Sequence, residues 1–137
     1  MGIDTPAFVY LLEEHPSHLR VVRPLFKAIS EGRLSAVTSS LTLLEVLVLP
    51  LRNRNVELAQ SYEDLLTDSR GLRLAAIGPE QIRGAARLRA QWPSLRTPDA
   101  LQLTAALLGG CSAFVTNDRR LPAIPGLKIL QLKDYTG

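Results

Sequence analysis

The sequence predicts an α/β fold in which several helices flank a mostly parallel sheet of four or five strands. Short apolar runs alternate with amphipathic stretches along the 137 residues, and this alternation is typical of βαβ units. The chain has no internal repeat and no low-complexity linker, and its length suits one domain. We therefore expect a single domain over residues 1–137.

The first half of the chain contains two strand candidates and four helix candidates. Asp4 can cap the first helix, and Pro6 is tolerated in its first turn. The second helix has apolar residues at helical spacing and ends at Gly32, and Ser39-Ser40 caps a third helix that Pro50 should stop. In chain order, we expect a strand over 1–3, helices over 5–13 and 18–31, a strand over 34–38, and helices over 41–49 and 56–67.

In the second half, dipeptides that contain glycine or proline separate three strand candidates and two helix candidates. Gly78-Pro79 begins a helix that Trp92-Pro93 closes, and Thr97-Pro98 begins another that Gly109-Gly110 ends. We expect strands over 72–77, 113–116 and 127–132, and helices over 80–91 and 97–108.

Glu45 is the only charged residue between Arg33 and Arg52, and it stands in a run that is apolar on nearly every side. A helix of this composition is predicted to be buried. A carboxylate inside it would have to be neutralised, paired or bound to a metal. The ordinary alternative is a Glu45 that reaches water through a narrow polar face or pairs with an arginine.

Three aspartates stand beside predicted elements in positions with two interpretations. Asp4 and Asp118 each follow a strand directly, and Asp99 lies in the first turn of a helix. Each could be a simple cap or turn residue. However, ligands bind beyond the carboxyl ends of strands in open α/β sheets, and Asp99 and Glu45 lie near helix starts at the same edge. Four carboxylates in one cleft would repel one another, and Mg²⁺ or Mn²⁺ is the natural ion to relieve this.

The chain is mildly basic, with 16 Lys and Arg against 13 Asp and Glu, a formal charge of +3. If the four site carboxylates bind metal, the rest of the surface carries about +7, which favours a polyanionic partner. Basic composition alone fits an ordinary solvated surface at least as well.

Several other classes of site and location lack support in the sequence. His15 and His18 have no cysteine partner, so a zinc site is not expected, and no nucleophile elbow, phosphate-binding loop or dinucleotide fingerprint is present. We see no secretory signal or membrane helix, and the single cysteine, Cys111, is compatible with the cytoplasmic location that we expect.

The stretches that contain these acids resemble the PIN domain, and within it the VapC-type toxins of bacterial and archaeal toxin–antitoxin systems. The resemblance spans essentially the whole chain, and the stretches around Asp99 and Asp118 are together its most specific part. The matching stretches are Ile3-Asp4-Thr5 with 8–12, residues 39–46, residues 97–107 and residues 114–121, and residues 124–130 also fit.

The resemblance implies a three-layer α/β/α sandwich with a parallel sheet and an endonuclease that hydrolyses RNA, commonly tRNA or rRNA. Thr116 and Asn117 match polar positions that support metal, water or phosphate. The implied partners are a cognate antitoxin that blocks the site, often with a basic residue, and a second copy in a homodimer. The implied catalytic residues and ligands of Mg²⁺ or Mn²⁺ are Asp4, Glu45, Asp99 and Asp118.

The chemistry expected from this assignment is in-line attack on phosphorus by hydroxide formed from water at the metal. The arginines that we consider for phosphate contact are Arg52, Arg54, Arg96, Arg119 and Arg120. Two other functions fit the same residues. One is a catalytically silent RNA-binding or partner-binding PIN-like domain, although binding a polyanion would not favour an acidic cluster. The other is a metal-dependent phosphohydrolase that acts on DNA or nucleotides.

Overall fold

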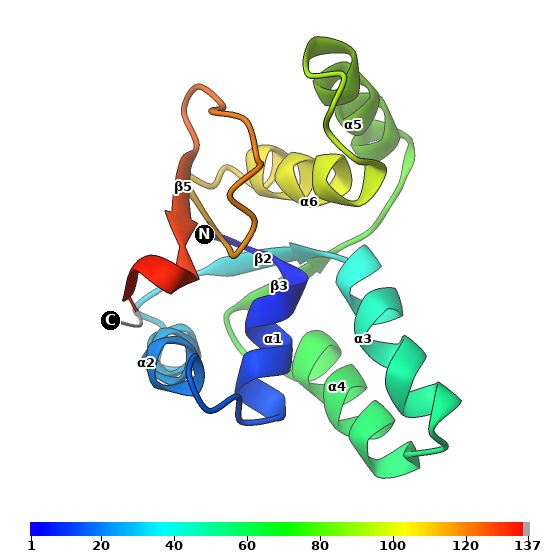
Figure 1. The fold of residues 1–137 in the computed structure, drawn as a ribbon, viewed down its shortest axis with the longest axis vertical. Helices are drawn as coiled ribbons and strands as arrows, with labels where there is room; N and C mark the ends of the chain where they lie inside the picture. The colour runs from blue at the N-terminus through cyan, green and yellow to red at the C-terminus, as the bar shows by residue number, and fades with distance from the viewer. Residues whose placement is uncertain (136–137) are drawn as a thin grey trace.

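A parallel five-stranded sheet lies at the centre of the structure, a computed structural model that describes residues 1–135 (Figure 1). The strand order is β3-β2-β1-β4-β5, and every neighbouring pair is parallel. The prediction of a mostly parallel sheet of four or five strands is therefore confirmed. The strands are β1 (Gly2–Ile3), β2 (Ala36–Ser39), β3 (Leu72–Ala75), β4 (Ala113–Thr116) and β5 (Lys128–Gln131).

Helices cover both faces of the sheet, with α5 and α6 on one face and α1 to α4 on the other (Figure 1). Successive residues of a strand point to opposite faces. Ile3 and Val115 accordingly join the apolar core beneath α1 to α4, whereas Phe114 joins the core beneath α5 and α6. This arrangement is the predicted three-layer α/β/α sandwich. The helices are α1 (Thr5–Leu12), α2 (Leu19–Ser30), α3 (Leu41–Arg52), α4 (Val56–Asp68), α5 (Pro79–Gln91) and α6 (Thr97–Leu108), and a 3₁₀ turn, η1 (Leu132–Tyr135), follows β5.

The two-residue strand β1 lies in the middle of the sheet, between β2 and β4. A Cβ atom at Gly2 would lie 2.6 Å from the Cβ of Ala106 and 2.8 Å from Cδ1 of Phe114, so glycine allows α6 to approach the central strand closely. The backbone N–H of Asp4 donates to the carbonyl of Val115 at 2.9 Å. The pairing of β1 with β4 therefore continues up to the first acid.

The winding of the chain creates a crevice at the carboxyl edge of the sheet. From β1 the chain winds outward through β2 to β3, and it then returns to place β4 on the other side of β1. The direction of winding thus reverses between β1 and β4, and ligands bind at such a point in open α/β sheets. Asp4 directly follows β1, and Asp118 lies two residues beyond β4.

The predicted end of the third helix at Pro50 is wrong, because α3 continues to Arg52. Pro50 has no N–H to donate to the carbonyl of Val46, so the helix loses that one bond, but the residues after Pro50 can still complete the turn. The N–H of Asn53 donates to the carbonyl of Leu49 at 2.9 Å and closes the turn around Pro50. The other helices and strands begin and end within two residues of the predicted bounds.

The prediction that this helix is buried on all sides is also wrong. Helix α3 packs mainly against α4, with smaller contacts to α1, α6 and β2, and its buried residues lie on one side. Leu44, Val48 and Leu51 on its other side are 61%, 42% and 62% exposed. An apolar residue does not have to be buried, so an apolar run alone cannot fix which sides of a helix meet solvent. Within residues 1–135 no helix is long and apolar enough to cross a membrane.

Candidate active site

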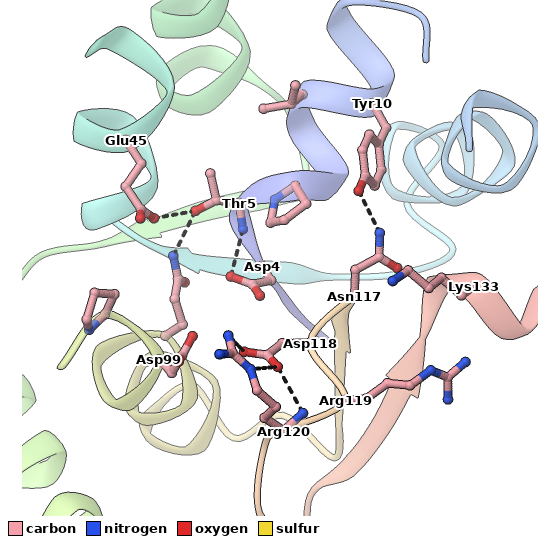
Figure 2. A pocket seen from close by; sticks show the side chains of 14 residues that line it. Asp4, Thr5, Tyr10, Glu45, Asp99, Asn117, Asp118, Arg119, Arg120 and Lys133 are labelled. Carbon is pink, nitrogen blue, oxygen red and sulfur yellow. Dashed lines mark hydrogen bonds and ion pairs between the residues drawn. The ribbon is translucent and has the colours of Figure 1, made fainter. Parts of the chain in front are cut away.

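The four predicted acids line one cavity of about 750 Å³ at the carboxyl edge of the sheet (Figure 2). Segments far apart in the sequence bring them there, because β1 and β4 are neighbours and α3 and α6 begin at the same edge. Their catalytic and metal-binding roles stay predictions. The acids are Asp4 after β1, Glu45 on α3, Asp99 in the first turn of α6 and Asp118 after β4.

Asp4 is largely buried, and hydrogen bonds fix both of its carboxylate oxygens. Its Oδ1 accepts from the backbone N–H of Thr5 at 2.9 Å, and its Oδ2 accepts from the hydroxyl of Thr116 at 2.8 Å. Burial raises the pKa of Asp4 to about 6, although both hydrogen bonds lower it, and the charges of Asp99 and Glu45 raise it further. A cation in the cavity would favour the ionised form of this carboxyl group.

Partial burial and nearby negative charge also raise the pKa of Asp99. Burial and the carboxylate of Asp118 raise the pKa of Asp99, whereas the guanidinium groups of Arg120 and Arg96 lower it. Raised carboxyl pKa values at Asp4 and Asp99 in one cleft are typical of functional sites.

Asp118 is in the opposite electrostatic situation, because Arg120 holds its carboxylate. The Nε and Nη2 atoms of Arg120 donate to Oδ1 and Oδ2 of Asp118 at 3.0 and 3.1 Å. The backbone N–H of Arg120 also donates to Oδ1, at 2.9 Å. These contacts lower the pKa of Asp118 below its ordinary value, so the carboxylate stays ionised.

Glu45 lies in the cavity but is exposed to solvent. The hydroxyl of Thr5 donates to its Oε1 at 2.7 Å. The argument that burial forces this carboxylate to be neutralised, paired or metal-bound is therefore wrong. Its position beside the other acids is the observation that now connects it with them.

A buried chain of hydroxyl and amide groups lies beneath the acids, and the sequence analysis did not identify it. Nε2 of Gln102 donates to the hydroxyls of Thr42 and Thr5 at 2.7 and 3.3 Å, and its Oε1 accepts from the N–H of Ser39 at 3.2 Å. Gln102 thus connects α6 with β2, α3 and the residue that holds Glu45. Gln102 follows Asp99 by three residues on the same face of α6, and this spacing is the signal that could have found it.

The two supporting polar residues contact other residues of the site. Thr116 is fully buried, and its Oγ1 donates to Asp4 and accepts from the backbone N–H of Asp118 at 3.0 Å. Asn117 lines the cavity, and its Nδ2 donates to Oη of Tyr10 at 2.6 Å. Thr116 is thus a positioning residue for the carboxylate of Asp4.

The arginines considered for phosphate contact fall into two groups. Arg119 and Arg120 line the cavity of the acids (Figure 2). Arg96 lines an adjoining pocket. Arg52 and Arg54 lie at the C-terminal end of α3 and beyond it, and they line neither cavity.

The chemistry of the donor groups suits a hard divalent cation, because four carboxylates line the same cavity. Oδ1 of Asn117 is a further oxygen donor, since it is buried and has no hydrogen-bond partner within residues 1–135. In this part of the chain, however, no three His, Cys, Asp or Glu side chains form an arrangement that could hold a metal ion as they stand. Binding Mg²⁺ or Mn²⁺ would therefore require side chains of the cavity to change position.

Comparison with known families agrees with this fold. The model of the PIN domain matches residues 1–127, so the chain belongs to the PIN domain family, a family of nucleases. The comparison with curated protein sequences gives no match.

Two solved structures share the fold over nearly the whole chain. The first is the VapBC2 complex from Rickettsia felis bound to a DNA fragment from its promoter, in which one chain has a TM-score of 0.72 and 19% identity, with 94% of this chain and 96% of that chain covered. The second is a toxin–antitoxin complex from Klebsiella pneumoniae, with a TM-score of 0.68, 21% identity and coverage of 91% and 92%. At these identities the similarity shows the fold.

Proposed function

We propose that this protein is a Mg²⁺- or Mn²⁺-dependent endoribonuclease and the toxin of a toxin–antitoxin pair. The observation that carries the proposal is the presence of four carboxylates in one cavity at the switch point of a PIN-domain sheet. Burial, together with the charges of neighbouring acids, raises the pKa values of Asp4 and Asp99, and a divalent cation would favour the ionised form of both carboxyl groups.

Each acid has a proposed role that follows from its surroundings. When bound, the metal supplies Lewis acidity, which promotes ionisation of water and offsets negative charge on the phosphate. Asp4 would hold it from the floor of the cavity, since two hydrogen bonds fix its carboxylate. Asp99 and Asp118 would complete the oxygen ligands, and Glu45, exposed at the cavity wall, would ligate the metal or orient the attacking water.

The proposed substrate is RNA, commonly a structured RNA such as tRNA or rRNA. Cationic side chains stand in the cavity next to the acids, namely Arg119, Arg120 and Lys133. Such groups suit the phosphates of a polyanion, whose charge also matches the basic composition of the chain. The choice of RNA over DNA rests on the resemblance to VapC-type toxins, and a cytoplasmic location follows from it as part of the proposal.

The proposed antitoxin would occupy a separate, smaller cavity. This cavity of about 180 Å³ lies between α1, α3 and α4 and shares Val9 and Glu45 with the cavity of the acids. Its apolar lining includes Val46, Leu49 and Leu58. A segment of the antitoxin could place apolar side chains in this cavity and, from there, extend a basic residue to the carboxylates. Leu49→Asp is expected to abolish co-purification with the co-expressed antitoxin.

The second proposed partner is another copy of this chain. Light scattering of the protein without antitoxin would show whether it forms this homodimer.

The experiment that tests this function offers three substrates to the purified protein: structured RNA, single-stranded DNA and a phosphomonoester. We expect the protein to cleave RNA internally and to leave the other two substrates intact. This cleavage should require Mg²⁺ or Mn²⁺ and should stop completely when EDTA is added. Cleavage of DNA or of the phosphomonoester instead would support the alternative phosphohydrolase. RNA binding without any metal-dependent turnover would identify a catalytically silent domain.

A further inference from the structure

The contact between Arg120 and Asp118 occupies both oxygens of a carboxylate that the proposed function assigns to a metal ion. Two guanidinium nitrogens and one backbone N–H of Arg120 donate to Asp118, at 2.9 to 3.1 Å. Three donors thus hold the carboxylate in one orientation (Figure 2). A cation could reach both oxygens of Asp118 only if the guanidinium group moved away.

The charge of Arg120 also acts on the neighbouring acid. Arg120, Asp99 and Asp118 line the same small pocket beside the main cavity, and the guanidinium lowers the pKa of Asp99 as well. Its positive charge therefore partly offsets the repulsion between Asp99 and Asp118. A bound divalent cation would have the same effect.

The side chain of Arg120 lies mostly in solvent and can move without disturbing the core. It is 68% exposed, whereas the side chain of Asp118 is 19% exposed, so the arginine reaches in from the solvent side. Because the guanidinium group lies on the solvent side, hydration offsets part of the free energy that is lost when the ion pair breaks. The backbone N–H contact can remain while the guanidinium moves, because it does not depend on the side chain of Arg120.

We propose that Arg120 is a tethered counter-ion of the acidic cavity, which holds Asp118 in the metal-free protein and must be displaced when a divalent cation binds. This inference rests on the proposed function. It makes Arg120 a positioning residue that sets the metal affinity of the site.

Arg119 provides a matched control. It is the preceding residue, lines the same cavity and is 57% exposed, but its Nη2 donates to Asp134 instead of an acid of the site. Arg119→Ala and Arg120→Ala therefore remove the same charge from the same cavity. Only the second frees the carboxylate of Asp118.

The test is calorimetric titration of Mn²⁺ into the wild type and three variants. We expect Arg120→Ala to bind Mn²⁺ about fivefold more tightly, the scale of one exposed ion pair. Arg119→Ala should bind as the wild type does, and Arg120→Lys should lie between the two, since lysine keeps the charge but loses the fork of two donors. Equal or weaker binding by Arg120→Ala overturns the inference, and so does equal tightening in Arg119→Ala. A wild type that binds no Mn²⁺ contradicts the proposed function itself.

An NMR titration with Mg²⁺ adds a direct readout of displacement. The Nε–Hε signal of Arg120, assigned by its loss in Arg120→Lys, should shift towards the position of a solvated arginine as the site fills. The signal of Arg119 should stay where it is. A stationary Arg120 signal, while the backbone amide signal of Asp118 moves, would overturn the displacement.

Discussion

The hydroxyl of Thr116 donates to Oδ2 of Asp4 at 2.8 Å and so joins the end of β4 to the end of β1. The same Oγ1 accepts from the backbone N–H of Asp118 at 3.0 Å. One buried side chain therefore orients two of the four acids at the point where the sheet reverses its winding.

Thr116→Val should keep the shape of this side chain and remove both hydrogen bonds. We expect the rate of RNA cleavage and the Mn²⁺ affinity to fall about 10- to 100-fold, the usual effect of losing a residue that orients a metal ligand. Thr116→Ser, which keeps the hydroxyl, should retain most of both. Wild-type affinity and cleavage in Thr116→Val would show that Asp4 does not depend on this contact.

Asp4 gives the protein a pH dependence of stability that can be measured without metal. Its pKa is raised from 3.8 to about 6 in the folded state, so between these values the folded protein binds more protons than the unfolded chain. The free energy of unfolding should therefore fall as the pH rises from about 4 to 6 and stay lower above that.

Asp4→Asn removes this titration, and urea unfolding in EDTA is the measurement. At about pH 8 we expect the variant to be more stable than the wild type by about 1–2 kcal/mol, since a largely buried charge is gone. At about pH 4 the difference should shrink towards zero. A loss of stability in Asp4→Asn that is the same at both pH values would contradict this account of the carboxyl group.

Gln102→Met tests the buried polar chain beneath the site. Methionine fills a similar volume but leaves the hydroxyl of Thr42 and the N–H of Ser39 without the amide. We expect the free energy of unfolding to fall by about 1–3 kcal/mol, because the buried N–H of Ser39 loses its acceptor. The matched control is Gln60→Met on the exposed side of α4, which should change it by less than about 0.5 kcal/mol. Equal effects would mean that the network stabilises nothing.

Gly2→Ala tests the close approach of α6 to the central strand. The added methyl group would meet Ala106 and Phe114 at less than 3 Å, so α6 or the strand must shift. We expect a loss of about 1–3 kcal/mol in the free energy of unfolding. Gly78→Ala places its methyl group in open space and should cost less than about 0.5 kcal/mol. A Gly2→Ala protein as stable as Gly78→Ala would contradict the packing described for β1.

The secondary-structure elements and their order could be predicted because they depend on short stretches of sequence. The alternation of apolar runs and amphipathic helices, with punctuation such as Gly78-Pro79 and Gly109-Gly110, indicated the elements and their order. The positions of Asp4 and Asp118 after strands placed them at one edge, because parallel strands share their carboxyl edge. Pro50 was misjudged because a proline removes one bond of a helix without preventing the next residues from continuing it.

The parts that could not be predicted depend on packing between distant segments. Whether Glu45 is buried depends on which side of α3 packs against α1 and α4. A helix that is apolar on nearly every side does not indicate which side this is. The bonds of Gln102 to Thr42 and Thr5 join residues 60 and 97 positions apart. The bond between Arg120 and Asp118 is local, yet no propensity rule states which of several nearby acids an arginine will choose.

The most direct test of the central claim is cleavage of RNA by Asp99→Asn in the presence of Mn²⁺, beside the wild type and Asp68→Asn. Asp99 lines the cavity, whereas Asp68 lies at the exposed end of α4. The account predicts that the wild type and Asp68→Asn cleave RNA until EDTA is added, and that Asp99→Asn loses at least about 100-fold in rate. Full activity in Asp99→Asn, or cleavage by the wild type that persists in EDTA, would contradict it.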